Sequence, residues 1–490
     1  MFEIGSYYPH PDHVKRLKRY RENKKLFLGE QFEVLEKHFG TLSQAQQRAI
    51  YVTANLAGII CKKNADFLFG ENAVYSAGKE DNSPEQKAIE RLVDENELNI
   101  TNYESALSNS YRGDSFYKIR YGQEQGGLLP PSIDPFKVII EAQNAEFVFP
   151  ETYPNDNTKI MGFHIAIPQE VKRTHSEEWV LNVESHFPNK LIKRKFRMNP
   201  TVTNVTGYPT EWRIYAEIGE PEVKETGVPF PLVVHIPNYT TDDTWEGIDD
   251  ISEHRGIFAE INNRLSQIAE ILDKHADPAL IVPQGTLVEG EDGSPQFRVG
   301  VDKVFEVMDN KEVKPEYVTW NGQLEYAFRE LEKLLDLLLM SAEIPMVALG
   351  AGDSGTSGSS GLAIKWRMNS LLAKINRKRQ YYDKGLKRVL LIAQLLEHDR
   401  KSKVDYEITK PLIKFKDGLP EDDTEKANVM SVRTGGKATI SQVRAIMELE
   451  NCTEEQARLI LKQIEEEERV EELDAFQTPA LFDENEGEEE

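Results

Sequence analysis

The sequence is poor in the features that would fix a covalent or membrane-bound framework. Its 490 residues contain only two cysteines, Cys61 and Cys452, which lie far apart and fit neither a disulfide framework nor a metal-ligand spacing. No apolar run approaches the roughly 18 residues of a membrane span, and the basic N-terminus lacks a following apolar region. We therefore expect no membrane segment, no signal peptide and synthesis in a reducing cytoplasm.

Motifs that carry chemistry are also missing. The sequence holds no HExxH, GxSxG or CxxC, and its ten histidines show no ligand spacing. The TGGKAT stretch at 434–439 has Ala438 where a P-loop needs Ser or Thr. Gly350, Gly352 and Gly355 fit G-x-G-x-x-G, but they follow a leucine-rich helical pattern, and no carboxylate for a ribose stands about twenty residues later. A flexible loop is favoured over a nucleotide site, so we expect no enzyme activity, cofactor or metal.

Positive charge is scarce relative to negative charge. The chain has 59 Lys and Arg against 83 Asp and Glu, a net charge of −24, and the acidic end from residue 464 supplies about half of the excess. A protein that wraps DNA needs a basic face to release counterions, so tight DNA binding is disfavoured, although contact with moving DNA is not. A second acidic run could bind a divalent cation, but its irregular spacing favours a solvated turn. Its members are Asp242, Asp243, Glu246, Asp249 and Asp250.

Periodicity in the first 240 residues predicts an α+β fold. Residues 31–70 have a helical pattern, residues 101–112 predict another helix, and 116–122 predict a strand. Further strands are expected between 132 and 150. From about 160 to 236, short β-type runs alternate with Asn, Pro and Gly turns, as in an antiparallel sheet.

The middle of the chain predicts two packed helices that flank a small β module. Apolar residues recur every three or four positions near 258–272 and again near 324–338, and strand-like runs lie between the two patterns. Such helices can pair as antiparallel neighbours, which gives a stalk with a tip. The residues expected to pack are Phe258, Ile261, Leu265, Ile268, Leu272, Phe328, Leu331, Leu335 and Leu338.

A Gly/Ser loop at 350–361 precedes a long predicted helix from 362 to about 397, which at 1.5 Å per residue would be about 54 Å long. Basic residues cluster on one arc of this helix, apart from its apolar arc. The basic arc either meets anions or forms salt bridges with acidic residues of the same chain, and the sequence leaves both open. Its members are Arg367, Lys374, Arg377, Lys378, Lys384 and Arg388. Beyond it, 422–472 predicts short helices, with Thr453 and Gln456 as a capping box, and 477–490 predicts a disordered tail.

Several extended segments resemble the portal proteins of siphophages that infect Gram-positive hosts. RLKRYRENKKLFLGE and NLAGIICKKNADFLFGE resemble the opening of that family, and YRGDSFYKIRYG resembles its central wing strands. Residues 245–285 are similar to the first stem helix of the family, with Asn262 and Ser266 as its polar positions. Residues 360–390 resemble the helix that follows its tunnel loop.

The resemblance implies a portal fold with an α+β wing, a two-helix stem, a small α/β clip, a long kinked helix after a tunnel loop, and a helical crown. The implied boundaries are wing 1–245, first stem helix 246–276, clip 277–322, second stem helix 323–345, tunnel loop 346–361, long helix and return to the wing 362–421, crown 422–476 and acidic tail 477–490. The tunnel-loop residues expected to face DNA are Gly350, Gly352, Asp353, Ser354, Thr356, Ser357, Ser359 and Ser360.

The function that the resemblance implies is a ring, usually of twelve copies, at one vertex of the virion capsid. Double-stranded DNA would pass through it without sequence specificity, and the ring would dock a large terminase subunit, a head-completion adaptor, and the major capsid and scaffold proteins. Two alternatives stay open. One is another head or neck ring component without a DNA tunnel, and the other is a nucleotide-binding enzyme that uses the Gly350–Gly355 loop.

Overall fold

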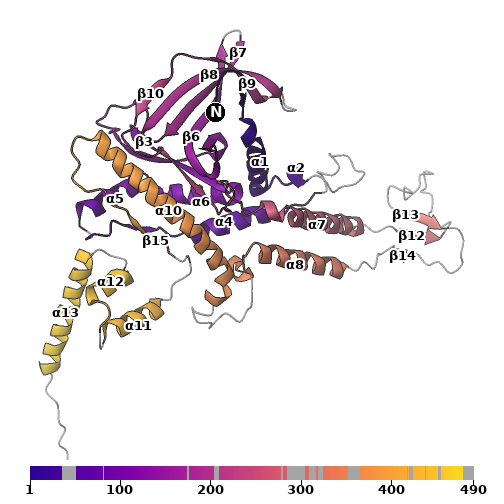
Figure 1. Ribbon diagram of the computed structural model, residues 1–490. Coiled ribbons are helices and arrows are strands. Elements are labelled where there is room, and N and C mark those ends of the chain that lie inside the picture. The colour runs from indigo at the N-terminus through magenta and orange to yellow at the C-terminus, as the bar shows by residue number, and fades with distance from the viewer. Residues whose placement is uncertain are drawn as a thin grey trace, which may run out of the picture.

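The computed structural model shows an α+β lobe from which a helical hairpin projects, with three further helices at the C-terminal end (Figure 1). Helices and antiparallel sheets are both extensive, so the α+β prediction is confirmed. The structure describes residues 1–35, 51–80, 82–173, 176–203, 209–276, 280–283, 304–307, 316–317, 324–350, 365–416, 418, 423–435, 438–450 and 454–477.

The N-terminal helices begin and end at residues suited to those positions. Gly29 (φ 87°) ends the first long helix in the left-handed region that favours glycine, and Asn55 caps a later one by accepting from Gly58 N at 3.0 Å. Residues 51–55 are not helical, so the helical prediction across 31–70 is wrong there, because Asn55 starts a new helix. The elements are β1 Tyr7–Tyr8, η1 Pro11–His13, α1 Val14–Leu28, α2 Phe32–Leu35 and α4 Leu56–Phe69.

A small sheet of order β11-β3-β4 forms the centre of the lobe, and β2 pairs with β15 nearby. Both predicted elements in this region, the helix at 101–112 and the strand at 116–122, are present as α6 and β3. The elements are β2 Val74–Ser76, α5 Pro84–Asp94, α6 Leu98–Arg112, β3 Asp114–Gly122, β4 Lys137–Gln143, β11 Val233–Pro237 and β15 Leu412–Lys414.

The predicted antiparallel sheet of 160–236 is present as a larger sheet with the order β1-β9-β8-β7-β6-β5, in which β10 also pairs with β8. Alternating Trp179, Leu181 and Val183 bury one face of β7. Residues 145–147, expected as strand, form a 3-10 turn capped by Asn144 instead. The elements are η3 Ala145–Phe147, β5 Val148–Tyr153, β6 Asp156–Arg173, β7 Ser176–Phe187, β8 Lys190–Thr203, β9 Pro209–Glu217 and β10 Glu222–Glu225.

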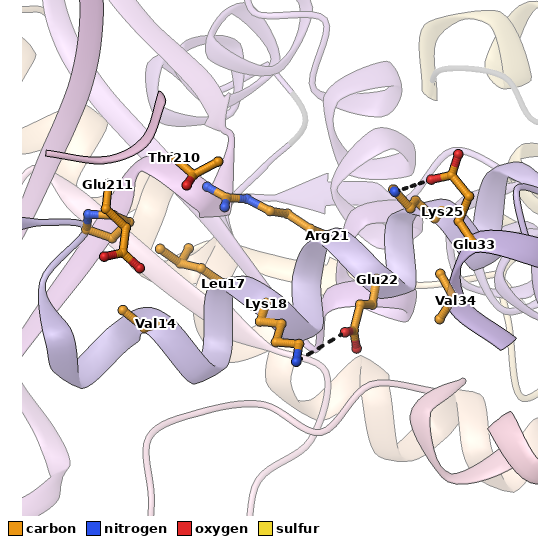
Figure 2. A pocket seen from close by; sticks show the side chains of 11 residues that line it. Val14, Leu17, Lys18, Arg21, Glu22, Lys25, Glu33, Val34, Thr210 and Glu211 are labelled. Carbon is orange, nitrogen blue, oxygen red and sulfur yellow. Dashed lines mark hydrogen bonds and ion pairs between the residues drawn. The ribbon is translucent and has the colours of Figure 1, made fainter. Parts of the chain in front are cut away.

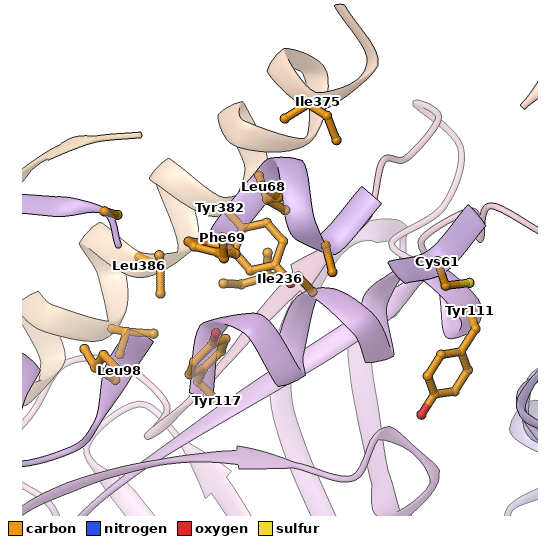
Figure 3. Close-up of a cluster of buried hydrophobic side chains, with 14 of the residues drawn as sticks. Cys61, Leu68, Phe69, Leu98, Tyr111, Tyr117, Ile236, Ile375, Tyr382 and Leu386 are labelled. Atoms are coloured by element: carbon orange, nitrogen blue, oxygen red, sulfur yellow. The ribbon is translucent and has the colours of Figure 1, made fainter. Parts of the chain in front are cut away.

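Two hydrophobic cores hold the lobe together. One lies under the larger sheet and includes Phe149 and Phe196. The other joins α4, α6, β3 and β11 to the helix α10 (Asn369–Arg400), and Figure 3 shows Phe69 of α4 beside Tyr382 of α10. The Phe69 and Tyr382 rings meet edge to face, with centroids 5.0 Å apart.

The projecting hairpin consists of α7 and α8, with three short strands between them in the chain (Figure 1). Strand β12 pairs in parallel with β13 and antiparallel with β14. The sequence predicted that this second helix ends at Pro345, and helix α8 ends four residues earlier, at Ser341. The elements are η4 Ser252–His254, α7 Arg255–Ala276, β12 Leu280–Pro283, β13 Val304–Val307, β14 Glu316–Tyr317, α8 Leu324–Ser341 and η5 Met346–Leu349.

Helix α10, Asn369–Arg400, crosses the lobe and is the longest helix among the described residues. Residues 365–367 are helical too, and a turn at Met368 separates them from α10. At 32 residues its length is about 48 Å, somewhat shorter than predicted. The C-terminal helices are α11 Asp423–Thr434, α12 Gln442–Glu450 and α13 Glu454–Gln477. The domain boundaries inferred above remain predictions.

Candidate functional site: the base of the helical hairpin

The two hairpin helices pack mainly at their base, next to the lobe. Phe258, Ile261, Ile268 and Leu338 are buried, and Leu265, Leu331 and Leu335 pack against the same core. Leu272 and Phe328, which lie farther along the hairpin, are 47% and 46% exposed. An ion pair between Arg264 and Glu330 at 3.0 Å joins the helices across the seam. Within a single chain, some of the apolar residues that were predicted to pack between the two helices are therefore exposed to solvent.

Two polar residues of α7 attach the hairpin to the segment before α4. Asn262 Oδ1 accepts from Ala54 N at 3.1 Å, and Ser266 Oγ accepts from Val52 N at 2.8 Å. Both side chains are buried, so each would leave a polar atom without a partner inside the protein if these hydrogen bonds were lost. These two positions were singled out in the sequence, and the structure shows that they fix α7 to the lobe.

Before α7, the chain closes tightly against the end of α6. Asp250 N donates to Ser110 O at 2.8 Å. Gly113 has a φ of 89°, and a Cβ on it would lie 2.3 Å from the carbonyl oxygen of Gly247. Only glycine permits this approach. The close contact places Asp250 under α10.

Asp250 is the centre of a buried charge cluster. Its carboxylate lies 3.2 Å from Lys374 Nζ, forms a short ion pair with Lys378, and accepts from Ser110 Oγ at 2.6 Å. Each of the three charged residues is less than a tenth exposed. Burial alone would raise the pKa of Asp250, but the two lysines more than offset burial and hold this pKa below its usual range. Burial lowers the pKa of Lys378 to about 8, although Asp250 acts in the opposite direction.

The same face of α10 also holds the end of α8. Lys374 Nζ donates to Ala342 O at 3.0 Å, and Arg377 Nη2 donates to both carboxylate oxygens of Glu343, at 2.5 and 2.8 Å. Asp250 stands just before α7, and Ala342 and Glu343 follow α8 directly. One turn of α10 therefore binds both ends of the hairpin, and α10 begins just after the Gly/Ser segment of the sequence.

The basic arc of the long helix therefore divides into two groups. Lys374 and Lys378 are buried within the chain, so they leave no surface for DNA, and Arg377 pairs with Glu343. For Lys374 and Lys378 the intramolecular salt-bridge alternative describes the geometry, and their assignment to a channel face is corrected. The Arg377 side chain is 54% exposed, so its place on a channel face stays a prediction. Arg367, Lys384 and Arg388 are exposed, and the Arg388 guanidinium lies 4.1 Å from the centroid of the Phe230 ring.

The acidic run before α7 also differs from its sequence interpretation. Asp249 and Asp250 are each 2% exposed, so this part of the run is not a solvated turn. Asp249 accepts from Ser252 N at 2.6 Å and from Ser252 Oγ at 2.7 Å, which fixes the turn that precedes η4 and α7. An aspartate shortly before a helical run could have indicated such a side-chain turn. Lys374 and Lys378, the partners of Asp250, follow it by more than a hundred residues, so no local sequence pattern indicates that they pair with it.

Of the residues expected to face DNA in the Gly/Ser loop, only Gly350 is described. It ends η5 with a φ of 73°. The other loop residues expected to face DNA lie outside the described residues: Gly352, Asp353, Ser354, Thr356, Ser357, Ser359 and Ser360. Thr453 of the expected capping box and Lys437 of the TGGKAT stretch also lie outside them.

One surface hollow of the lobe runs along α1 and has a volume of about 480 Å³ (Figure 2). Lys18 pairs there with Glu22, and Lys25 pairs with Glu33. Within the described part of the chain, no group of three or more His, Cys, Asp or Glu side chains could hold a metal ion. Likewise, none of the described helices is long and apolar enough to cross a membrane.

Comparison with known protein families gives one match that spans nearly the whole chain. The family model described as phage portal protein, SPP1 Gp6-like, matches residues 10–470. No curated protein matches the chain. The matched range includes the lobe, the α7–α8 hairpin, α10 and most of the C-terminal helices. The chain therefore belongs to the SPP1 Gp6-like family of phage portal proteins.

Proposed function

We propose that this chain forms the ring-shaped channel at one capsid vertex through which phage DNA is packaged, retained and ejected. The family match over residues 10–470 carries this proposal, and the family is one of structural proteins rather than enzymes. The projecting α7–α8 hairpin supports it, because helices that line a ring must be held at a fixed angle by the rest of each subunit. The Asp250 cluster and the Arg377–Glu343 pair would provide that hold.

In this proposal α7 and α8 form the stem, and residues 346–361 form the tunnel loop. Residues 277–322 form the clip, which docks the large terminase subunit and the head-completion adaptor. The wing and crown would meet the capsid and scaffold proteins.

Helices α7 and α8 together carry seven acidic residues and five Lys or Arg, so a channel wall made of them is slightly acidic. DNA has one charge per ~1.7 Å, and a strongly basic wall would bind it too tightly for sliding. The charge of the hairpin therefore suits a conduit.

The rival head or neck component would need the hairpin but no loop that meets DNA. Deletion of residues 352–359 in the phage that encodes the chain separates the two functions. We expect capsids that contain the variant at the vertex but hold much less DNA than normal, measured by DNA content per purified capsid. A deletion of the same length at the acidic end, 483–490, should leave packaging nearly unchanged. Normal DNA content with the shortened loop would contradict the assignment of 346–361 to the tunnel.

A further inference from the structure

The turn that ends α8 has an unusual residue at its centre. Ile344 N donates to Leu339 O at 2.9 Å, and Glu343 N donates to Met340 O at 3.2 Å. These two hydrogen bonds form a Schellman motif, in which the residue just after the helix takes a left-handed conformation. That residue is Glu343, with a φ of 59°. Because a Cβ disfavours this conformation, glycine is the residue expected at such a position.

Two other helices of the lobe end with the expected residue. Gly29 follows α1 with a φ of 87°, and Gly113 follows α6 with a φ of 89°. A glutamate in the same position after α8 therefore needs an interaction that compensates for the backbone strain. Its side chain supplies one, because Arg377 Nη2 donates to both carboxylate oxygens of Glu343, at 2.5 and 2.8 Å. Glycine at position 343 would relieve the strain but could not form this ion pair.

The two residues before Glu343 are also held by side chains from outside α8. Ser341 Oγ lies within hydrogen-bond distance of His254 Nδ1, at 3.2 Å, and Ala342 O accepts from Lys374 Nζ at 3.0 Å. Three successive residues of one turn are thus each bound by a different side chain. The contacts indicate that the direction in which the chain leaves α8 is closely controlled.

The ion pairs at the two ends of the hairpin differ in exposure. Before α7, the side chains of Asp250, Lys374 and Lys378 are each less than a tenth exposed. After α8, the Arg377 and Glu343 side chains are 54% and 38% exposed. Opening a buried pair leaves an unpaired charge in the interior, whereas an exposed pair opens at little cost because water and salt replace the partner. The joint before α7 is therefore fixed, and the pair after α8 is able to open.

We propose that Glu343 and Arg377 form a releasable latch at the end of α8. The closed latch holds Glu343 in the left-handed conformation, so residues 344–350 leave α8 in one direction. When the latch opens, the strain at Glu343 is no longer opposed and the turn at 342–344 unwinds, while Asp250 keeps the start of α7 in place. The latch is a property of a single chain and does not depend on the ring. It goes beyond the proposed function by adding a movable joint between α8 and α10.

Hydrogen–deuterium exchange of the full-length chain, measured by mass spectrometry over residues 340–350, tests the latch. Glu343→Gln keeps the side-chain size but removes the charge, so the amides of residues 342–344 should exchange about fivefold faster. Glu343→Gly removes the strain together with the pair, so their exchange should stay within about twofold of the unmodified chain. The matched control is Asp383→Asn, which breaks a partly exposed pair with Lys387 on α10 and should leave these amides unchanged.

A charge swap gives an independent test of the pair. Arg377→Glu alone should speed exchange at the turn, and the double variant Glu343→Arg with Arg377→Glu should restore slow exchange. Peptides over residues 251–260, at the start of α7, should exchange equally slowly in every variant, because the buried joint stays closed.

Several results would overturn the latch. If Glu343→Gln exchanges no faster than the control, or if the charge swap gives no rescue, the pair does not hold the turn. If Glu343→Gln and Glu343→Gly are equally fast, the pair does not oppose backbone strain. If residues 251–260 speed up together with the turn, the two joints are not independent. Failure to form rings would contradict the proposed function alone, because these exchange rates are measured within one chain.

Discussion

Asp250 has two buried lysines around it and a single negative charge. Its removal would leave Lys374 and Lys378 in the interior without a counter-charge, and breaking a buried pair in this way costs about 3–5 kcal/mol. We therefore expect Asp250→Asn, which keeps the side-chain shape, to lower the free energy of unfolding by that amount in denaturant titrations. Asp383→Asn, which breaks the partly exposed pair with Lys387, should change it by less than about 1 kcal/mol. Similar small effects for both variants would contradict the view that the cluster supports the hairpin.

Glu397 gives a prediction about pH at the other end of α10. Burial would raise its pKa, but Arg91, Lys401 and Tyr406 donate to its carboxylate and lower the pKa to about 2, from 4.5 for the free side chain. Because the folded pKa is the lower one, the pair stabilises the fold above about pH 4.5, and this stabilisation disappears as the pH falls towards 2. The melting temperature of Glu397→Gln should therefore fall less steeply over this range than that of the unmodified chain. Parallel pH profiles would show that Glu397 does not contribute in this way.

At the scale of elements, local periodicity was enough to predict α6, β3, the larger antiparallel sheet, α7 and α8. Each has a repeating apolar pattern that matches one packed face, as in Trp179, Leu181 and Val183. The prediction failed where a distant partner decides the outcome. Lys374 and Lys378 look like a solvated basic face until Asp250 is brought beneath them by the Gly113–Gly247 contact. The break at 51–55 depends likewise on Asn262 and Ser266, which accept hydrogen bonds from the backbone of that non-helical segment.

The base of α8 gives a prediction at this scale. Leu338 is fully buried against the lobe, whereas Met340, two residues later, is 74% exposed. Leu338→Ala should lower the free energy of unfolding of the subunit by about 2–5 kcal/mol, because it leaves a cavity in the core. Met340→Ala should change it by less than about 0.5 kcal/mol. If the two variants were equally stable, the hairpin base would not be packed as described.

For the whole molecule, the described chain has a packed lobe and a hairpin that exposes large apolar side chains both near its base and farther out. Leu272, Phe328, Leu337 and Met340 all expose large apolar side chains along the hairpin. A second copy of the hairpin on each side would cover this surface, as expected for neighbours in a ring.

Electron microscopy of the purified full-length chain, combined with its native mass, tests the ring most directly. The account predicts closed rings of about twelve copies with a central hole wide enough for duplex DNA, and hairpins directed along the channel axis. A chain that remains monomeric at every protein and salt concentration, or that forms only closed dimers, would contradict it.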